Sequence, residues 1–240
     1  MDKFLNYFDE RYRKSVLGSH SPNDGPVITI SRQTGCDARE VALKVADGLN
    51  FRLGTTKWRW VDKDIIYSIA RELNIDYNRI ENYYEGLKLT DLSEMIMAFS
   101  GNFVSDLRVK KAIKDVVLSI CKEGYVVLVG RGGAEIAREI KDSLHVRLVA
   151  PFNWRVDNVM RKKKMDAGKA RDYVLLTDKK RVELMKTFIE VKTQDMESLF
   201  DLTVNRFSFS VNDTADIILS MFEKKILGRI TERRRINTIL

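Results

Sequence analysis

Hydrophobic positions along this chain alternate between short β-branched or aromatic runs and longer stretches with the spacing of a helix face. Five short runs predict strands: Val27–Ile30, Trp58–Val61, Tyr125–Val129, Leu144–Ala150 and Phe200–Asn205. Such brief, continuously apolar runs are typical of strands that are buried on both faces of a sheet. Because each run is followed by a helical pattern, the sequence predicts an α/β fold, a five-stranded parallel sheet with helices on both faces.

The helical stretches predict how the chain is divided. Residues 1–25 form an N-terminal helix and loop, 26–222 form the main domain, and 223–240 form a basic C-terminal helix. Within the main domain, 74–122 is helical in pattern and separates two strands, which indicates a helical insertion. Residues 153–191 predict a basic pair of helices after the fourth strand.

The first strand leads into a glycine-containing turn and then a helix. Ser31–Ala38 is polar with Gly35 in its middle, and helical spacing begins at Arg39. This order is the architecture of a phosphate-binding loop, in which backbone N–H groups and the helix dipole attract an anion. In the register of the Walker pattern, however, Ala38 replaces the lysine, and Glu40 replaces the hydroxyl residue that would hold magnesium. A plain strand–turn–helix unit of an α/β core is the alternative.

Charged residues stand where ligands bind in such a fold. Asp37 falls among the phosphate-facing positions, where a carboxylate would repel phosphate unless it points away. Asp62 follows the second strand, so it either contacts a ligand at the sheet edge or caps the next helix. Arg131 follows the third strand among Gly130, Gly132 and Gly133. The glycines allow a tight turn, and a guanidinium binds phosphate in bidentate fashion.

Composition narrows the class of protein. Hydrophobic residues make up 44% of the chain, which supports a packed core. No apolar run approaches the roughly 20 residues that span a bilayer, and Met1–Val16 lacks the apolar block of a signal peptide. We therefore expect a cytoplasmic protein without a membrane partner. Cys36 and Cys121 fit reduced thiols, and two Cys with two His disfavour a structural zinc site, so no metal-ligating residue is predicted.

A net charge of +8 predicts anionic ligands without choosing among nucleotides, nucleic acid and acidic lipids. Much of the excess lies in Arg161–Lys164 and Arg233–Arg235, and such runs are usually solvated helix faces. Asp178 and Arg181 lie three residues apart on a predicted helix and share a face. By spacing alone they indicate a surface ion pair of little energetic weight.

Taken in order, these motifs resemble the cytidylate kinase-like family of P-loop nucleoside monophosphate kinases. The similarity covers about Val27–Met221 and leaves the terminal helices outside it. The matching positions are Ser31, Arg32, Gly35, Arg39 and Val41 in the loop, Asp62-Lys63, Gly130-Arg131-Gly132, Ala150-Pro151, Arg155, Arg161, Asp178 and Arg181.

The resemblance implies an enzyme that moves the γ-phosphoryl of ATP, with Mg²⁺, to a nucleoside monophosphate or a similar small phosphorylated acceptor. It implies that 74–122 binds the acceptor and that 153–191 is a lid. The implied donor-binding residues are Arg32, Gly35, Cys36, Asp37, Ala38, Arg39 and Glu40. The implied catalytic residues are Arg39, in place of the lysine, with Arg155 and Arg161 from the lid. The implied acceptor-binding residues are Asp62, Arg131, Asp178 and Arg181, with Asp62 as an organiser of the acceptor side or the metal.

Two other interpretations stay open. Cys36-Asp37-Ala38 stands where the family has Ser-Gly-Gly, which together with Glu40 favours an inactive kinase fold that binds a nucleotide or a partner protein. Nucleic-acid binding through the two basic clusters is the third interpretation, and we expect it least. The sequence does not identify the acceptor, and the extra terminal helices are compatible with a homodimer.

Overall fold

The computed structural model describes residues 25–62, 106–188 and 197–228. Five strands form one sheet in the order β2-β3-β1-β4-β5, and every neighbouring pair is parallel. This confirms the predicted five-stranded parallel sheet. The strands are β1 (Val27–Arg32), β2 (Arg59–Val61), β3 (Val126–Val129), β4 (Ser143–Val149) and β5 (Leu202–Asn205).

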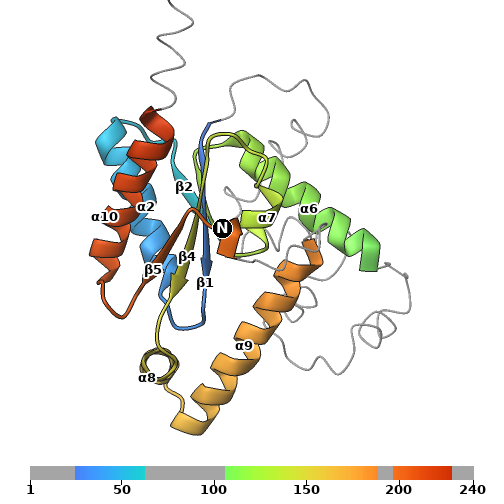
Figure 1. The fold of residues 1–240 in the computed structure, drawn as a ribbon, viewed down its shortest axis with the longest axis vertical. Helices are drawn as coiled ribbons and strands as arrows, with labels where there is room; N and C mark the ends of the chain where they lie inside the picture. Colours follow the sequence, from blue (N-terminus) through green and yellow to red (C-terminus); the bar gives the residue numbers. More distant parts are fainter. Residues whose placement is uncertain (1–24, 63–105, 189–196, 229–240) are drawn as a thin grey trace, which may run out of the picture.

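Helices cover both faces of this sheet (Figure 1). Of the helices in the described ranges, α2 (Ala38–Leu53) and α10 (Val211–Phe222) cover one face and α6 (Asp106–Glu123), α7 (Gly133–Ile136) and α9 (Ala167–Phe188) the other, while α8 (Phe152–Lys163) lies beyond the carboxyl ends of the strands. The remaining elements are the 3-10 turn η1 (Glu197–Leu199) and the π-helical turn η2 (Glu223–Leu227).

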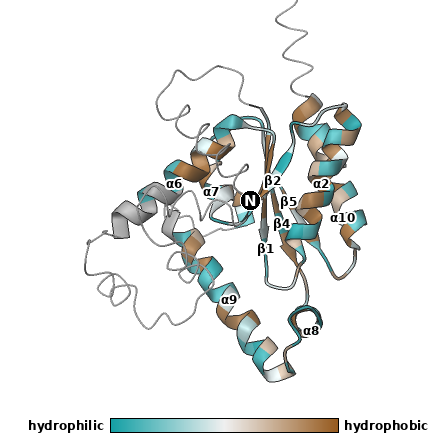
Figure 2. Cartoon of the chain, turned by 180° about the vertical axis from the view of Figure 1, so that it is seen from behind, coloured by the Kyte–Doolittle hydropathy of each residue, from teal (hydrophilic) through white to brown (hydrophobic). Residues whose placement is uncertain are grey.

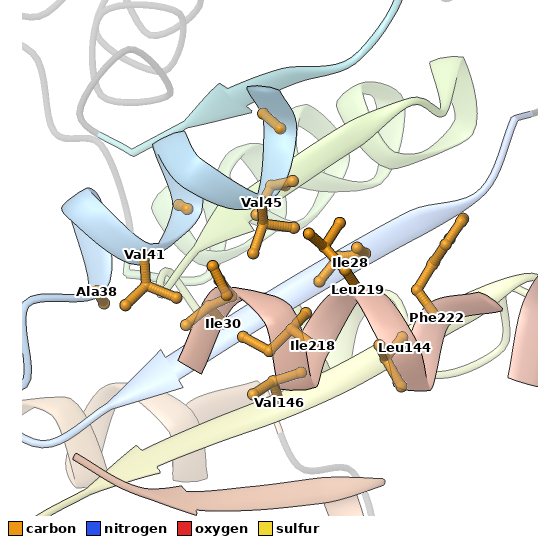
Figure 3. Packing of buried hydrophobic residues seen from close by; sticks show 14 of the residues in the cluster. Ile28, Ile30, Ala38, Val41, Val45, Leu144, Val146, Ile218, Leu219 and Phe222 are labelled. Atoms are coloured by element: carbon orange, nitrogen blue, oxygen red, sulfur yellow. The ribbon is translucent and has the colours of Figure 1, made fainter. Parts of the chain in front are cut away.

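The main core lies between the sheet and the helix pair α2 and α10 (Figure 3). Ile28 and Ile30 of β1 meet Ile218 and Leu219 of α10 there, all nearly or fully buried. Burying one such side chain stabilises the fold by about 1.5–3 kcal/mol. Gly48 of α2 permits the close approach, since a Cβ there would lie 2.7 Å from Leu219. Figure 2 shows the same layering, with hydrophobic residues on the strands and on the helix faces that meet them.

Some element boundaries differ from those predicted. β1 runs to Arg32, beyond the predicted Ile30, and the short helix α7 ends at Ile136, before β4 begins at Ser143. The helix after β5, α10, begins at Val211. Ser210 is its N-cap and forms a capping box with Asp213, which places Asp213 inside the first turn.

Several predicted elements lie outside the described residues. These are the helix within 1–25, the part of the insertion over 74–105, and the basic cluster Arg233–Arg235. The division into 1–25, 26–222 and 223–240, with its insertion and lid, therefore stays a prediction. No helix within the described ranges has both the length and the apolar character needed to cross a membrane.

Candidate functional site

The carboxyl ends of β1 and β3 meet α8 and α9 at one edge of the sheet (Figure 1). Ligands of open α/β sheets bind at this edge. Residues 33–37 connect β1 to α2 here, and we call them the loop. Gly130–Gly132 form the turn after β3.

The loop adopts a backbone that glycine ordinarily provides. Gly35 has φ 89° and Asp37 has φ 53°, both in the left-handed region. Asp is among the few other residues that occupy this region readily, so the loop can turn here without a glycine at position 37. A Cβ on Gly35 would lie 2.7 Å from the carbonyl oxygen of Arg155, so α8 packs directly on the loop.

Cys36 and Ala38 turn their side chains into the core, where they are 1% and 5% exposed. Burial raises the pKa of the Cys36 thiol to about 12, so this thiol stays neutral and acts in packing. These two positions of the candidate donor site therefore offer an incoming ligand their backbone only.

The Asp37 carboxylate points towards α8 and β5. It accepts a hydrogen bond from Asn158 Nδ2 at 2.8 Å and pairs with Lys162 Nζ at 2.7 Å and Arg206 Nη2 at 3.7 Å. Asp37 is the N-cap residue of α2, yet its side chain makes no capping hydrogen bond. The N–H groups that open α2 consequently have no partner within the helix and remain available to an anion.

Side chains of α8 hold the loop in this conformation. Asn158 donates to the carbonyl oxygen of Gly35 at 2.7 Å, and Lys162 pairs with Glu40 at 2.7 Å. Arg161 is exposed and donates to Asn158 Oδ1 at 2.7 Å. Arg161 thus orients Asn158, and its predicted contact with a transferring phosphoryl stays a prediction.

Asp178 of α9 connects the loop to α8. Its Oδ1 accepts hydrogen bonds from both the N–H and the hydroxyl of Thr34, each at 2.7 Å. Its Oδ2 accepts one from Arg155 at 2.5 Å, and Arg181 lies 3.8 Å from Oδ1. Arg155 is buried and also donates to the carbonyl oxygens of Ala150 and Thr34. In this structure the Arg155 guanidinium braces the loop, and its predicted catalytic role is untested.

A cavity of about 40 Å³ lies between the ends of β1 and β3 and helix α9. Arg32, Arg131 and Arg181 line it, together with the glycine turn after β3. Gly130 has φ 75°, and a Cβ there would collide with the Arg32 guanidinium. Its lack of a side chain therefore makes room for Arg32. Because one water needs about 10–15 Å³ of such volume, the cavity has room for roughly three waters or one small polar group.

Positive charge exceeds negative charge around this cavity. Asp62 lies beside it, with guanidinium nitrogens of Arg39, Arg32 and Arg131 at 3.6, 3.8 and 4.0 Å. These distances exceed those of hydrogen bonds, and within the described part of the chain the buried Asp62 Oδ1 accepts none. Burial, followed by the neighbouring Arg181 charge, lowers the pKa of Arg32 to about 9. An anion placed here would relieve that repulsion.

The structure thus brings together Arg32, Arg131 and Arg181 around one cavity, with Asp62 beside it and Asp178 linking it to the loop. Arg39 is 59% exposed, contacts Asp62 and lies 5.3 Å from the centre of the Trp60 ring. Neither Arg39 nor the two α8 arginines, Arg155 and Arg161, lines the cavity. Whether Asp62 also caps a following helix concerns residues outside the described ranges.

Four further residues of this edge were not singled out from the sequence as individual site residues. Thr34 donates to Asp178, and Asn158 donates to the loop backbone at Gly35. Lys162 and Arg206 both pair with the Asp37 carboxylate. Two signals were present in the sequence. Asn158 and Lys162 are four residues apart and share a helix face. Arg206 follows a strand end, as Asp62 and Arg131 do.

The described residues fit the phosphates of a nucleotide but offer Mg²⁺ little. Open N–H groups at the start of α2 and nearby arginines suit phosphate oxygens. By contrast, Glu40 is held by Lys162, and Asp62 is surrounded by arginines. No group of three His, Cys, Asp or Glu that could hold a metal occurs in 25–62, 106–188 or 197–228.

Residues 27–207, well over half of the chain, match the sequence model described as the cytidylate kinase-like family. Among solved structures, an uncharacterised protein from Eubacterium ventriosum superposes with a TM-score of 0.57 and 20% identity, covering 84% of this chain and 99% of that one. This likeness shows the fold. Shikimate kinase from Acinetobacter baumannii superposes with a TM-score of 0.47 and 14% identity, covering 83% of this chain and 94% of that one.

A curated relative is a uronate isomerase from Corynebacterium glutamicum, 26% identical over 129 residues. The match covers 54% of this chain and 24% of that protein. The chain therefore spans about a quarter of the length of the relative, too little to carry its activity over.

Proposed function

This chain belongs to the cytidylate kinase-like family, and from that premise we propose that it transfers the γ-phosphoryl of ATP to a nucleoside monophosphate or a similar small phosphorylated acceptor. The observation that carries the proposal is the cavity lined by Arg32, Arg131 and Arg181. Its size suits one phosphate group, and guanidinium groups match phosphate oxygens in geometry and charge. The acceptor phosphate is assigned to this cavity.

The donor phosphates are assigned to the start of α2. Here the first N–H groups are uncapped and the positive end of the helix dipole points at the loop. Gly35 keeps the turn open, and Cys36 and Ala38 keep their side chains in the core. Arg39, at the start of α2, is assigned the place of the absent lysine, since it is an exposed cation whose guanidinium lies 3.6 Å from Asp62.

Transfer requires positioning and charge neutralisation more than covalent chemistry from the protein. A phosphate oxygen of the acceptor forms a bond to the γ-phosphorus as the bond from that phosphorus to the β,γ-bridging oxygen breaks, giving ADP and a phosphorylated acceptor. Arg131 and Arg181 hold the acceptor oxygens in line with the donor. Asp178 keeps Arg181 oriented through its 3.8 Å contact. Arg155 and Arg161 complete the lid side of the reaction.

Magnesium ordinarily neutralises the phosphate chain in such reactions. The described carboxylates are engaged by cations, so we derive no step through a protein-held ion. We place the reaction in the cytoplasm, where the two buried cysteines, Cys36 and Cys121, would stay reduced. A nucleotide and a small phosphorylated substrate are the proposed partners, and a homodimer stays a proposal.

A transfer assay tests the function. The protein is incubated with ATP labelled in its γ-phosphate, Mg²⁺ and a panel of nucleoside monophosphates and sugar phosphates, and labelled products are separated. One acceptor should be phosphorylated in preference to the others. Folded protein that binds ATP but labels no member of the panel would count against a phosphotransferase.

The second candidate is an inactive kinase fold that binds a nucleotide, and one contact favours it. Asp178 already occupies the N–H and hydroxyl of Thr34, so a carboxylate of the protein itself fills part of the loop. A resident carboxylate competes with an incoming phosphate. Calorimetry with ATP discriminates the two: an Asp178→Asn variant that gains affinity without any transfer, beside an inactive wild type, would favour the second candidate.

A further inference from the structure

The loop and the first turn of α2 contain two carboxylates where a phosphate-binding loop ordinarily has none. Asp37 is the residue before α2 and Glu40 lies in its first turn. Both would repel the phosphates that the proposed function places there. We propose that Lys162 of α8 is a positioning residue that makes the loop able to bind a nucleotide triphosphate, by neutralising Asp37 and Glu40 and holding them away from the anion. This inference rests on the proposed function.

One ammonium group serves both carboxylates. Lys162 Nζ lies 2.7 Å from Asp37 Oδ1 and 2.7 Å from Glu40 Oε1. Partial burial works against its charged form, yet the hydrogen bonds to Asp37 and Glu40 prevail and raise the pKa of Lys162. Lys162 therefore carries its charge at neutral pH.

The two carboxylates differ in how much they depend on Lys162. Asp37 also receives a hydrogen bond from Asn158 and lies 3.7 Å from Arg206. For Glu40, Lys162 is the ion-pair partner observed within the described residues. Loss of Lys162 would consequently release Glu40 first, and Glu40 sits on the helix turn whose N–H groups face the anion.

The position of Lys162 also separates this loop from the Walker arrangement. There the lysine belongs to the loop itself, at the place that Ala38 occupies here. Ala38 is buried, and the cation comes instead from the α8 helix, more than 120 residues later in the chain. The charge of the loop is thus set by the packing of α8 against it. Lys162 acts on the donor phosphates through Asp37 and Glu40, so it is not assigned a direct contact with the nucleotide.

The inference is tested by titrating ATP into the full-length protein and measuring Kd by calorimetry. Lys162→Met keeps the length of the side chain and removes the charge, and about a tenfold to hundredfold weaker Kd is expected. Lys163→Met is the matched control: it removes the same charge from the same helix, but Lys163 lies over the Tyr173 ring at 4.8 Å. Its Kd should stay within about twofold of wild type, as for a screened exposed charge.

A rescue separates charge neutralisation from simple structural damage. Lys162→Arg restores the cation, and adding Glu40→Gln to Lys162→Met removes the repelling carboxylate. Both variants should recover most of the lost affinity. If Lys162→Met had instead damaged the fold, adding Glu40→Gln would not restore binding. Transfer assays on the same proteins should show the change in the KM for ATP rather than in kcat.

The outcomes distinguish this inference from the proposed function. If wild type binds ATP but phosphorylates nothing, the function fails while the Kd series still decides about Lys162. If wild type transfers phosphate and the Kd for ATP of Lys162→Met equals that of Lys163→Met, the inference is overturned and the proposed function stands. Failure of Glu40→Gln to rescue Lys162→Met would also overturn it.

Discussion

Three arginines that lie far apart in sequence line one cavity because three different elements end beside it. Arg32 closes β1, Arg131 follows β3, and Arg181 lies on α9. Arg181 also donates to the Thr34 hydroxyl at 3.0 Å, so its guanidinium is held by the loop. Burial lowers the pKa of both Arg32 and Arg181, because a buried guanidinium loses the water that stabilises its charge. A bound phosphate would stabilise the charged forms.

Replacing Arg181 by Met should weaken acceptor binding. A hydrogen bond to a charged group is worth about 1.5–3 kcal/mol, so the KM for the acceptor should rise roughly tenfold to hundredfold while the KM for ATP changes little. Steady-state kinetics with the acceptor found in the transfer screen would measure this. Lys179→Met, an exposed charge on the same helix, is the control, and equal effects of the two variants would remove Arg181 from the acceptor site.

A second residue-scale prediction concerns stability and pH. His145 is buried between the hydroxyls of Thr29 and Ser143, and burial lowers its pKa from the ordinary 6.5 to about 4. Between these values the unfolded chain binds a proton that the folded protein does not. Stability is therefore complete above pH 6.5 and is lost as the pH falls towards 4, by at most about 1.4 kcal/mol per pH unit.

Urea unfolding at several pH values between 4 and 7 would measure this slope. His145→Asn removes the titrating group, so its free energy of unfolding should depend less on pH in this window, whatever its absolute stability. If the free energy of unfolding of wild type and of His145→Asn changed equally with pH, His145 would not contribute to the pH dependence of stability.

At the scale of elements, helix α8 determines the direction and the charge balance of the carboxylates at the start of α2. The sequence correctly predicted the strand, turn and helix, because their apolar periodicity reports burial directly. It also identified Asp37 as a problem that only the direction of the side chain could settle. That direction comes from Asn158, Lys162 and Arg206, which lie more than 120 residues away in sequence. No local pattern encodes such contacts.

The pair Asp178 and Arg181 illustrates the same limit. Spacing on one helix predicted a shared face, and by itself favoured a surface ion pair of little weight. The structure instead places Asp178 on the N–H and hydroxyl of Thr34 and against Arg155. These partners come from the loop and from α8, so the energetic role of the pair depended on tertiary packing that the sequence pattern does not contain.

The turn after β3 offers a matched test at this scale. Gly130 and Gly54 both have positive φ, at 75° and 59°, but only a Cβ at Gly130 would collide with Arg32, whereas nothing lies within 4 Å at Gly54. Each change to Ala should cost roughly 1 kcal/mol of stability through backbone strain. Only Gly130→Ala should also lose affinity for the acceptor, because it displaces Arg32.

Thermal unfolding and acceptor kinetics on the two glycine variants would separate these effects. Equal loss of acceptor affinity in both variants would mean that the fit between Gly130 and Arg32 has no bearing on binding.

At the scale of the whole molecule, the site residues lie at the carboxyl ends of the strands. The stability of the fold comes mainly from the core between the sheet and helices α2 and α10. Within the described residues, the core between β1, β4, α2 and α10 includes the neutral Cys36 thiol but none of the arginines or carboxylates of the site. Figure 3 shows its apolar packing. Around Asp62 and Asp178, five arginines face two carboxylates, namely Arg32, Arg39, Arg131, Arg155 and Arg181. The folded protein should therefore be stabilised by a multivalent anion that the unfolded chain does not bind.

Pyrophosphate should raise the melting temperature more than sodium chloride of equal ionic strength. A ligand present at about 100 times its Kd stabilises by about 2.7 kcal/mol through mass action. Differential scanning calorimetry would record the shift, which should shrink in Arg181→Met and persist in Lys179→Met. Equal shifts with chloride and pyrophosphate would indicate screening alone.

The most direct test of the account is a crystal structure of the protein with a non-hydrolysable ATP analogue and inorganic phosphate. We expect the triphosphate within hydrogen-bonding distance of the N–H groups that open α2, and the phosphate held by Arg131 and Arg181 in the cavity. A triphosphate bound elsewhere on the molecule, with that cavity holding water only, would contradict the account.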